Sequence, residues 1–533
     1  MNRKTLVLPA IVGLLAPVLA ACGSSDSGDA AGKPIVVGTT DTFEATPDAP
    51  APFDPAHAYD VGGWNIMRPS LQTLMRVPRG GGAPVPEAAE SCGFTDTENT
   101  SYRCKLRPGL QFSDGKPLDA TDVKFSIERS LKIMDKNGPV SLLTNIDAVE
   151  AKGDNEVVFH LKTSDATFPY KLATPAGSIV DNQTYARDKV RAGFKVSGSG
   201  PYTVDIETKG KSVTKAVFTK NPLYKGSVEL KNDKVEIRSY PNSAAMEKAL
   251  KSGEIDMMSR TITPEQINKM SVSQDQKIKL VELTGLEIRY LGFNTTDPVV
   301  KNKAVRQAMA SIVDRTHLTS SVYGSAAEPL YSLIPTTITG HKNSFFSKYP
   351  KADPKKAADL LRGAGIKTPV KLTLTYTNDH YGSATKKEFE VLQQQLNDSK
   401  LFDVSVKGVK WSTFSPNQKA GKYAVYGMGW FPDFTDGDNY VAPFLDKDNF
   451  LNSPYVNNEI RTSLIPQSRR EAQRGSATPA FERVQDIVAE DVPILPLWQG
   501  KQYIAARSDI TGTEWAVNFA ADLQLWELGR GVA

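Results

Sequence analysis

The residues best suited to chemistry gather between Trp430 and Asp438. Asp433 follows Trp430 by three residues, and Asp436 and Asp438 come close behind it. Three carboxylates at this density could hold a cation, but the spacing of a calcium-binding EF-hand loop and its closing Glu are absent. The local pattern, which contains Pro and Gly, therefore favours a solvated turn, with Asp433 as a turn former and Trp430 in a core.

Recognisable catalytic patterns are missing elsewhere in the sequence. No zinc-binding HExxH, nucleophile-bearing GxSxG or phosphate-binding P-loop occurs. The five histidines are scattered, without paired metal-ligand spacing: His57, His160, His317, His341 and His380. We expect a protein that is not an enzyme, with no catalytic residues, no cofactor and no metal site, although missing motifs do not by themselves exclude an enzyme.

The amino terminus has the pattern of an export signal. Arg3 and Lys4 precede an apolar stretch at 6–20, which is too short to span a bilayer comfortably. The stretch ends in Leu-Ala-Ala-Cys-Gly at 19–23, which resembles the lipobox of bacterial lipoproteins. The resemblance implies a signal peptide at 1–21, acylation of Cys22 and anchoring at the outer face of the bacterial cytoplasmic membrane. The alternative is an ordinary secretory signal followed by a chance cysteine. Residues 22–33 are rich in Ser, Gly and Ala and predict a flexible tether.

The three cysteines fit the same location. If Cys22 carries lipid, Cys92 and Cys104 remain as a pair outside the cytoplasm, where disulfides persist. The turn-rich residues between them predict a disulfide across a β-hairpin, with two free thiols as the alternative. No histidine lies close enough in sequence to complete a zinc site.

Length and charge exclude other classes. A chain of 533 residues with 40% hydrophobic content predicts two or three domains. The net charge is +4, and it is nearer +2 once the basic residues of the leader are removed. This balance gives no electrostatic reason to expect nucleic-acid binding. No later apolar run is long enough to predict a membrane-spanning helix.

Strands and helices alternate along the chain, which predicts an α/β protein with mixed sheets. Strands are predicted at 35–38, 102–106, 157–161, 370–376, 423–429 and 493–498. Helices are predicted to begin at Thr121 or Asp122, at Asn242 or Ser243, and at Asn302. Two further helices are predicted around 389–396 and 481–489.

Several blocks together resemble the family 5 extracellular solute-binding proteins, the peptide receptors of ABC importers and their nickel, haem and glycan relatives. The longest is KLRPGLQFSDGKPLDATDVKFS at 105–126. Shorter blocks follow the family's order: FDPA at 53–56, GSGPY at 198–202, NPLY at 221–224, ALKSGEID at 249–256, YLGFNT at 290–295, GWFPD at 429–433 and PILPL at 493–497. The resemblance extends over about residues 34–515.

The resemblance implies a periplasmic-binding-protein-like two-lobe fold of type II, with an extra domain and a ligand cleft between the lobes. Carried onto this chain, lobe one combines 34–78, 197–285 and 500–533. The extra domain is 79–196, and lobe two is 286–499. Such proteins work by closing a hinge around the solute.

The resemblance also implies ligand-binding residues and partners. In peptide-binding members an Asp three residues after a Trp holds the ligand's ammonium, so Asp433 would bind it and Trp430 would form a wall. Position suggests further contacts, with a scaffold role as the favoured alternative for each. They are Phe43 and Glu44 in the loop after the first strand, Asn378 and Tyr381 beyond the strand at 370–376, and Trp498 near a lobe crossing. No basic residue for a ligand carboxylate can be placed. The expected partners are a peptide and the permease subunits of an ABC importer, and the expected state is a monomer.

Three alternatives stay open at this point. The solute could be a glycan stacked on tryptophans, or nickel or haem, for which His380 is a faint ligand candidate. The chain could be a surface lipoprotein peptidase. It could also be a signalling or adhesion lipoprotein that retains a binding fold.

Overall fold

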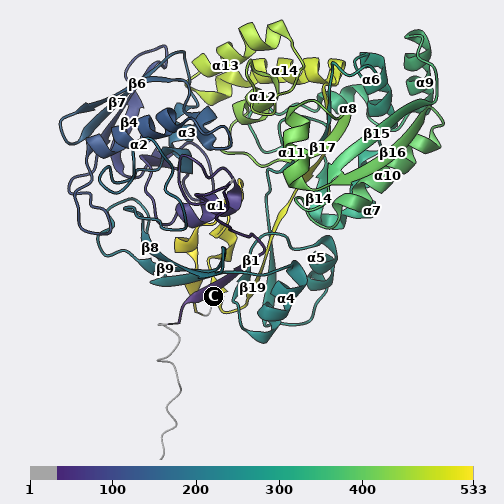
Figure 1. Cartoon of the computed structure of the whole chain (residues 1–533). Coiled ribbons are helices and arrows are strands. Elements are labelled where there is room, and N and C mark those ends of the chain that lie inside the picture. Colours follow the sequence, from purple (N-terminus) through teal and green to yellow (C-terminus); the bar gives the residue numbers. More distant parts are fainter. Residues whose placement is uncertain (1–32, 48, 532–533) are drawn as a thin grey trace, which may run out of the picture. The chain divides into compact units, whose positions relative to one another are not determined.

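The computed structural model describes residues 33–47 and 49–531. The predicted signal peptide, the lipidation site Cys22 and nearly all of the tether therefore lie outside the described residues. Within the described part, no helix combines the length and apolar character that crossing a membrane requires. The fold is α/β, as predicted, and it is built around three sheets (Figure 1).

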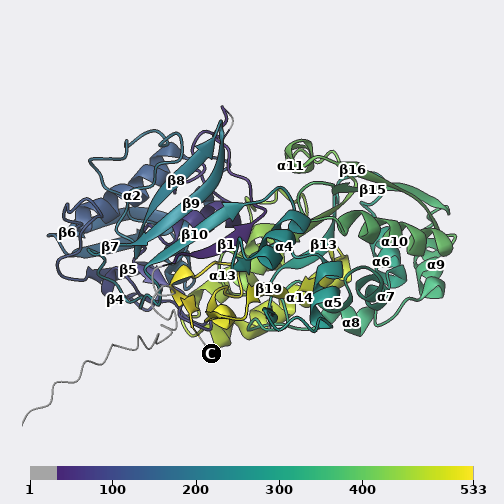
Figure 2. The same ribbon diagram turned by 90° about the horizontal axis from the view of Figure 1, so that it is seen from below.

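The seven-stranded sheet contains the first strand of the described chain. Its order is β12 (Ile278–Leu283), β19 (Gln502–Arg507), β11 (Met257–Met258), β1 (Ile35–Thr39), β10 (Lys234–Ser239), β9 (Ser212–Lys220) and β8 (Tyr202–Lys209). β1 runs parallel to both β10 and β11, whereas the outer strands pair antiparallel. Figure 2 shows the part of this sheet from β1 to β8. Because parallel neighbours end at one edge, the residues that follow β1 and β11 meet there.

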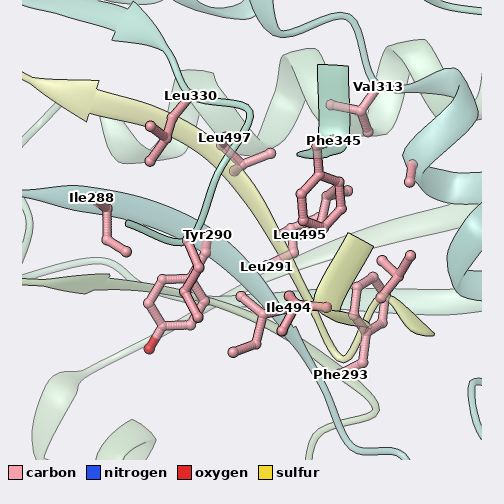
Figure 3. Packing of buried hydrophobic residues seen from close by; sticks show 14 of the residues in the cluster. Ile288, Tyr290, Leu291, Phe293, Val313, Leu330, Phe345, Ile494, Leu495 and Leu497 are labelled. Carbon is pink, nitrogen blue, oxygen red and sulfur yellow. The ribbon is translucent and has the colours of Figure 1, made fainter. Parts of the chain in front are cut away.

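The six-stranded sheet is formed by later residues. Its order is β14 (Ala327–Pro329), β18 (Ile494–Gly500), β13 (Ile288–Phe293), β17 (Val425–Trp430), β15 (Val370–Thr377) and β16 (Phe402–Val409). Its central strands β13, β17 and β18 are buried along their whole length. Apolar side chains from β13 and β18 pack together there with neighbouring residues such as Leu330 and Phe345 (Figure 3). This packing fixes the strand ends that carry the candidate site.

A smaller, four-stranded antiparallel sheet has the order β4 (Ala89–Phe94), β5 (Ser101–Leu106), β7 (Glu156–Leu161) and β6 (Ile146–Lys152). Cys92 and Cys104 lie opposite each other in the β4–β5 hairpin and form the predicted disulfide, with sulfurs 2.00 Å apart. Two short pairs complete the strands: β2 (Met75–Arg76) with β3 (Val85–Pro86), and β20 (Ile510–Thr511) with β21 (Gly529–Arg530).

The helices begin largely where polar capping residues predict. α4 (Ser243–Ser252) is capped by Asn242 and α6 (Lys303–Ile312) by Asn302, each accepting a backbone N–H bond. α2 (Ala120–Ile133) begins before the predicted Thr121, because the Asp119 side chain caps it. The others are α1 (Val61–Met67), α3 (Phe168–Leu172), α5 (Pro264–Ser271), α7 (Arg315–Val322), α8 (Ser344–Lys348), α9 (Pro354–Gly363), α10 (Thr385–Asp398), α11 (Trp411–Lys419), α12 (Asp438–Leu445), α13 (Ile465–Arg470) and α14 (Thr478–Asp491).

Two short connections join the six-stranded and seven-stranded sheets. One is the segment 284–287 between β12 and β13, and the other is Lys501 between β18 and β19. Figure 1 shows β19 at the lower end of a long yellow ribbon. They touch closely, because a Cβ placed on Gly285 would lie 2.2 Å from the Gly500 carbonyl oxygen. Apart from Gly500, the last residue of β18, the strands of the three sheets lie within the segments predicted for the two lobes and the extra domain. The domain boundaries themselves stay a prediction.

Candidate functional site

Asn439 organises the segment that follows β17. It lies in the first turn of α12, and its Oδ1 accepts a bond from the backbone N–H of Asp433 at 2.8 Å. The same oxygen accepts a longer bond, 3.4 Å, from Nε1 of Trp430. One amide side chain thus fixes both residues of the predicted Trp–Asp pair.

Asp433 is held by neutral groups. Its Oδ2 accepts bonds from the Tyr59 hydroxyl at 3.0 Å and from Asn439 Nδ2 at 3.1 Å. Within the described residues, no Lys, Arg or His nitrogen forms an ion pair with it. Burial raises the pKa of Asp433 to about 6, and the nearby charge of Asp522 adds to the rise, against the two hydrogen bonds. An ionised carboxylate that is withdrawn from water in this way is unfavourable unless a cation pairs with it.

Aromatic rings surround this carboxylate. Trp430 packs against Phe444 and Phe450, with ring centroids 5.6 and 6.2 Å apart. Tyr59 meets Phe450 edge to face at 5.2 Å. Tyr59 lies between β1 of the seven-stranded sheet and α1, whereas Asp433 follows β17 of the six-stranded sheet. The hydrogen bond between them therefore links segments that belong to the two large sheets. Asp433 itself remains half-buried.

The other two acidic residues of the segment are not in a solvated turn, so that prediction was wrong. Asp436 and Asp438 are buried, at 5% and 2% exposure. Arg474 binds Asp436 through two bonds of 2.7 and 2.9 Å, and Arg469 binds Asp438 at 3.0 Å. The turn pattern predicted that these carboxylates would be solvated by water, but arginines distant in sequence bind them instead. Asp436 and Asp438 are therefore scaffold.

Arg289 is a site residue that sequence reasoning missed. It lies on β13 opposite Gly429 of β17 and opposite Trp498 of β18. Its guanidinium lies 3.8 Å from the ring centroid of Tyr381 and 5.2 Å from that of Trp498. Two predicted site residues, Tyr381 and Trp498, therefore meet at this arginine. The signal in the sequence was a single charged residue inside an otherwise apolar strand.

Gly429 makes room for this arginine. A Cβ added to Gly429 would lie 1.4 Å from Nη1 of Arg289. Arg289 forms an ion pair with Glu287, yet its buried Nη1 has no hydrogen-bond partner. Burial raises the pKa of Glu287, against the charges of Arg289 and Arg260.

A second arginine approaches from the seven-stranded sheet. Arg260 follows β11 in the left-handed backbone region, with φ of +64°. Its Nε lies 3.3 Å from Asp41, which follows β1. Arg260 and Arg289 both lie 5.8 Å from the ring centroid of Phe431, between Trp430 and Asp433. The segment 429–433 therefore contacts two cations at one end and carries Asp433 at the other.

The remaining predicted residues have well-defined surroundings. Trp498 donates from Nε1 to Glu388 at 3.0 Å and packs on Tyr323. Asn378 is exposed beyond β15. Phe43 is buried against Phe53, and the exposed Glu44 accepts a bond from Ser212. The structure brings together Trp430, Asp433, Tyr381 and Trp498 around one segment, but gives Phe43 and Glu44 other contacts. Ligand binding by each stays a prediction.

His380, the candidate metal ligand, stacks on Trp411 with ring centroids 3.9 Å apart. The protein packed around this surface ring, together with Arg289 and Arg260, lowers the pKa of His380 to about 4. Across the described chain, no three His, Cys, Asp or Glu side chains group as metal ligands would.

Two hollows lie elsewhere in the molecule. One, of about 700 Å³, runs along α9 and is open to solvent. The other, of about 40 Å³, is lined by residues including Arg68, Gln72 and Trp526. Neither includes Trp430 or Asp433, so the chemistry of the side chains, rather than open volume, identifies the candidate site.

Comparison with known proteins agrees with this fold and site. The family model for bacterial extracellular solute-binding proteins, family 5 (middle region), matches residues 83–452. The chain therefore belongs to the family 5 bacterial extracellular solute-binding proteins, and it has their two-lobe, type II periplasmic-binding-protein fold.

Individual relatives differ in what their names say they bind. The chain is 26% identical to Di/tripeptide-binding protein 1 of Pseudomonas aeruginosa, covering 87% of this chain and 89% of the relative. It is also 26% identical to Heme-binding protein A of Haemophilus influenzae, covering 90% and 91%. The solved periplasmic binding protein DppA of Helicobacter pylori, in complex with the peptide STSA, superposes with a TM-score of 0.77 at 22% identity, covering 94% and 98%.

Proposed function

We propose that this chain captures short peptides outside the cytoplasm and passes them, chemically unchanged, to the permease subunits of an ABC importer. The observation that carries the proposal is Asp433, a half-buried carboxylate held by Tyr59 and Asn439 without a cation among the described residues. A peptide's ammonium supplies the missing charge, and Trp430 forms a wall beside it. Burying a carboxylate is favourable only when such a partner is present.

Ligand binding is coupled to closure of a hinge between the two large sheets. The two connections at 284–287 and Lys501 form the hinge, and the Tyr59–Asp433 bond links segments on its two sides. A peptide held between these segments binds the closed arrangement better than the open one, and that difference drives closure. The importer then recognises the closed form.

A lipid anchor keeps the protein at the membrane. Cys22 carries the lipid after removal of residues 1–21, and the tether 22–33 lets a monomer reach the importer. The Cys92–Cys104 disulfide fits the oxidising surroundings outside the cytoplasm. A Cys22→Ala variant should leave the membrane fraction while it keeps its ligand affinity. Retention at the membrane would contradict the anchor.

The identity of the ligand can be tested on native material. The purified full-length protein is denatured, and the released small molecules are identified by mass spectrometry. We expect peptides of a few residues at about one per protein, unchanged after prolonged incubation. Haem, which one relative's name suggests, nickel or a glycan would contradict a peptide receptor, and cleaved peptides would indicate a peptidase.

A further inference from the structure

A second contact joins the two sides of the proposed hinge, and it involves the predicted extra domain. Asn99 lies between β4 and β5, and its Nδ2 donates to the backbone carbonyl of Arg470 at 2.8 Å. The backbone N–H of Ala166, between β7 and α3, donates to the carbonyl of Arg469, also at 2.8 Å. Both acceptors are the last residues of α13. These four residues are called the latch: Asn99, Ala166, Arg469 and Arg470.

The latch supplies donors to carbonyls that need them. The last carbonyls of a helix have no partner within the helix. In α13 the carbonyls of 469 and 470 are bound by loops of the four-stranded sheet, which lies in the segment predicted as the extra domain. Opening of the hinge breaks both bonds and leaves these carbonyls to water. The closed arrangement therefore gains two hydrogen bonds that need no ligand.

The donor side of the latch is fixed within the extra domain. Asn99 has a φ of +56°, in the left-handed region that Asn enters more readily than most residues, and it is only 2% exposed. Its carbonyl accepts a bond from the backbone N–H of Asp165 at 3.1 Å. Asp165 is bound by Nζ of Lys171 at 2.6 Å. Burial acts to raise the pKa of Asp165, but the charges of Lys171 and Arg469 lower it to about 2.

Arg469 connects the latch to the candidate ligand site. Its carbonyl belongs to the latch, while its Nε donates to Asp438, the first residue of α12, at 3.0 Å. The next residue, Asn439, fixes both Asp433 and Trp430. A single side chain therefore links the latch to the helical turn that orients the proposed partner of the ligand's ammonium.

An apolar contact accompanies the latch. Phe434 directly follows Asp433, yet it is 2% exposed, and its ring lies 6.0 Å from that of Tyr170 in α3. Phe434 belongs to a buried cluster whose other members lie in the segments predicted as lobe one and the extra domain. Burial of this ring also favours the closed arrangement without a ligand.

We infer that the latch holds part of the unliganded population closed, and that Asn99 is a positioning residue that sets peptide affinity without touching the peptide. This inference rests on the proposed function, because it takes closure as part of binding. The apparent affinity of a ligand is its affinity for the competent form multiplied by the fraction of molecules in that form. Each contact that raises the closed fraction therefore strengthens binding.

Two measurements on the full-length protein test the latch. Hydrogen exchange of the Ala166 amide, followed by mass spectrometry, reports the open fraction of the unliganded protein, because opening exposes this N–H to water. Titration with a pool of Ala-Xaa-Ala tripeptides with free termini reports the apparent affinity, which follows the closed fraction. A variant that lowers the closure equilibrium by some factor should therefore show that factor as a product, the fold increase in exchange multiplied by the fold loss of affinity.

Asn99→Gly removes the side-chain donor and keeps a residue that tolerates the left-handed backbone. The loss of one net hydrogen bond lowers an equilibrium constant about fivefold, so the product should be about five. A product near one would overturn the inference.

A matched control loses a comparable bond away from the latch. Asn145→Gly removes a bond of 3.0 Å to the carbonyl of Thr163, within the extra domain. Its product should stay near one. An equal product in this control would overturn the inference, because the effect would not be specific to the latch.

Asn99→Asp provides a second variant if the glycine variant does not fold. It keeps the size of the side chain and its tolerance of the left-handed backbone, but an ionised carboxylate has no N–H to donate. The product should again be at least about five, as for the loss of one net bond. A product near one in this variant would contradict the role of Asn99.

The wild type separates this inference from the proposed function. The tripeptide pool should slow exchange of the Ala166 amide, because a ligand that favours closure lowers the open fraction. No binding of the pool, or binding without slower exchange, would overturn the proposed function, and the inference with it. Slower exchange on binding, together with a product near one in the Asn99 variants, would overturn the latch alone.

Discussion

Asp433 and Asp436 lie three residues apart on one segment, yet the protein treats their charges in opposite ways. Asp436 is bound by two nitrogens of Arg474, which itself donates to backbone carbonyls of Ser468 and Glu471. Asp433 has only a hydroxyl and an amide as partners, and burial raises its pKa to about 6. A charge that the protein neutralises itself stabilises the fold, whereas a half-buried charge left without a counter-ion is available to a ligand.

The same contrast holds for the arginines. Arg474 and Arg469 are tied to Asp436, Asp438 and Asp446. Arg289 and Arg260 each keep one buried nitrogen without a partner. The charged groups that are paired within the protein therefore belong to the scaffold. The charged groups without a complete set of partners mark the candidate ligand site.

The largest effect is expected from removing a satisfied charge. Asp436→Asn leaves Arg474 buried without its carboxylate, and breaking a buried pair in this way costs about 3 kcal/mol. The free energy of unfolding, measured by denaturant titration, should fall by that amount. A loss below about 1 kcal/mol would show that Asp436 is not the structural counter-ion described above.

The second largest effect is expected on peptide affinity when Asp433, three residues before Asp436, is also replaced by Asn. Asp433→Asn removes the charge that pairs with the ligand's ammonium, and peptide affinity should fall about 100-fold, or about 2.7 kcal/mol. Calorimetric titration with the peptides released from native protein provides the measurement. Asp436→Asn, studied well below its melting temperature, should stay within about threefold of the wild type. Similar losses of peptide affinity in both variants would contradict the assignment of Asp433 to the ligand and of Asp436 to the scaffold.

Asp433→Asn should also stabilise the unliganded protein, in contrast to Asp436→Asn. The folded-state pKa of about 6 exceeds the ordinary value of 3.8, so ionised Asp433 destabilises the fold at pH 7. Each pKa unit corresponds to 1.36 kcal/mol, and partial exposure reduces the total to about 2 kcal/mol. The difference between variant and wild type should shrink as the pH falls from 6 to 4, because the wild-type carboxyl takes up a proton. A destabilised variant would contradict the raised pKa.

The smallest effect is the dependence of affinity on pH. A proton and the ligand's ammonium compete for Asp433, so affinity should be constant above pH 7 and fall by up to about tenfold for each unit below pH 6. Asp433→Asn should show a flat profile over the same range. A wild-type profile that stays flat down to pH 5 would mean that no charge on Asp433 is used in binding.

Much of this architecture could be predicted because its signals are local. The caps Asn242 and Asn302, the alternation along β15 and the Cys92–Cys104 hairpin each depend on residues close in sequence. The ordered blocks predicted the family. Through the family resemblance, the Trp430–Asp433 spacing pointed to Asp433 as the acidic residue of the candidate site.

The rest of the site depends on contacts that no local pattern contains. Tyr59 reaches Asp433 across 374 positions of sequence, and Arg474 reaches Asp436 across 38. The turn-like pattern around Asp436 therefore predicted solvent where an arginine lies. Arg289 and Arg260 were missed because their relation appears only when two sheets place them beside Phe431.

The central claim is that the ligand's ammonium binds the Asp433 carboxylate. The most direct test compares a peptide released from native protein with its N-acetylated form, by calorimetry, in the wild type and in Asp433→Asn. The account predicts about 100-fold weaker binding of the acetylated peptide to the wild type, and a ratio near one in the variant. Equal loss on acetylation in both proteins would contradict it, because the ammonium would then bind elsewhere.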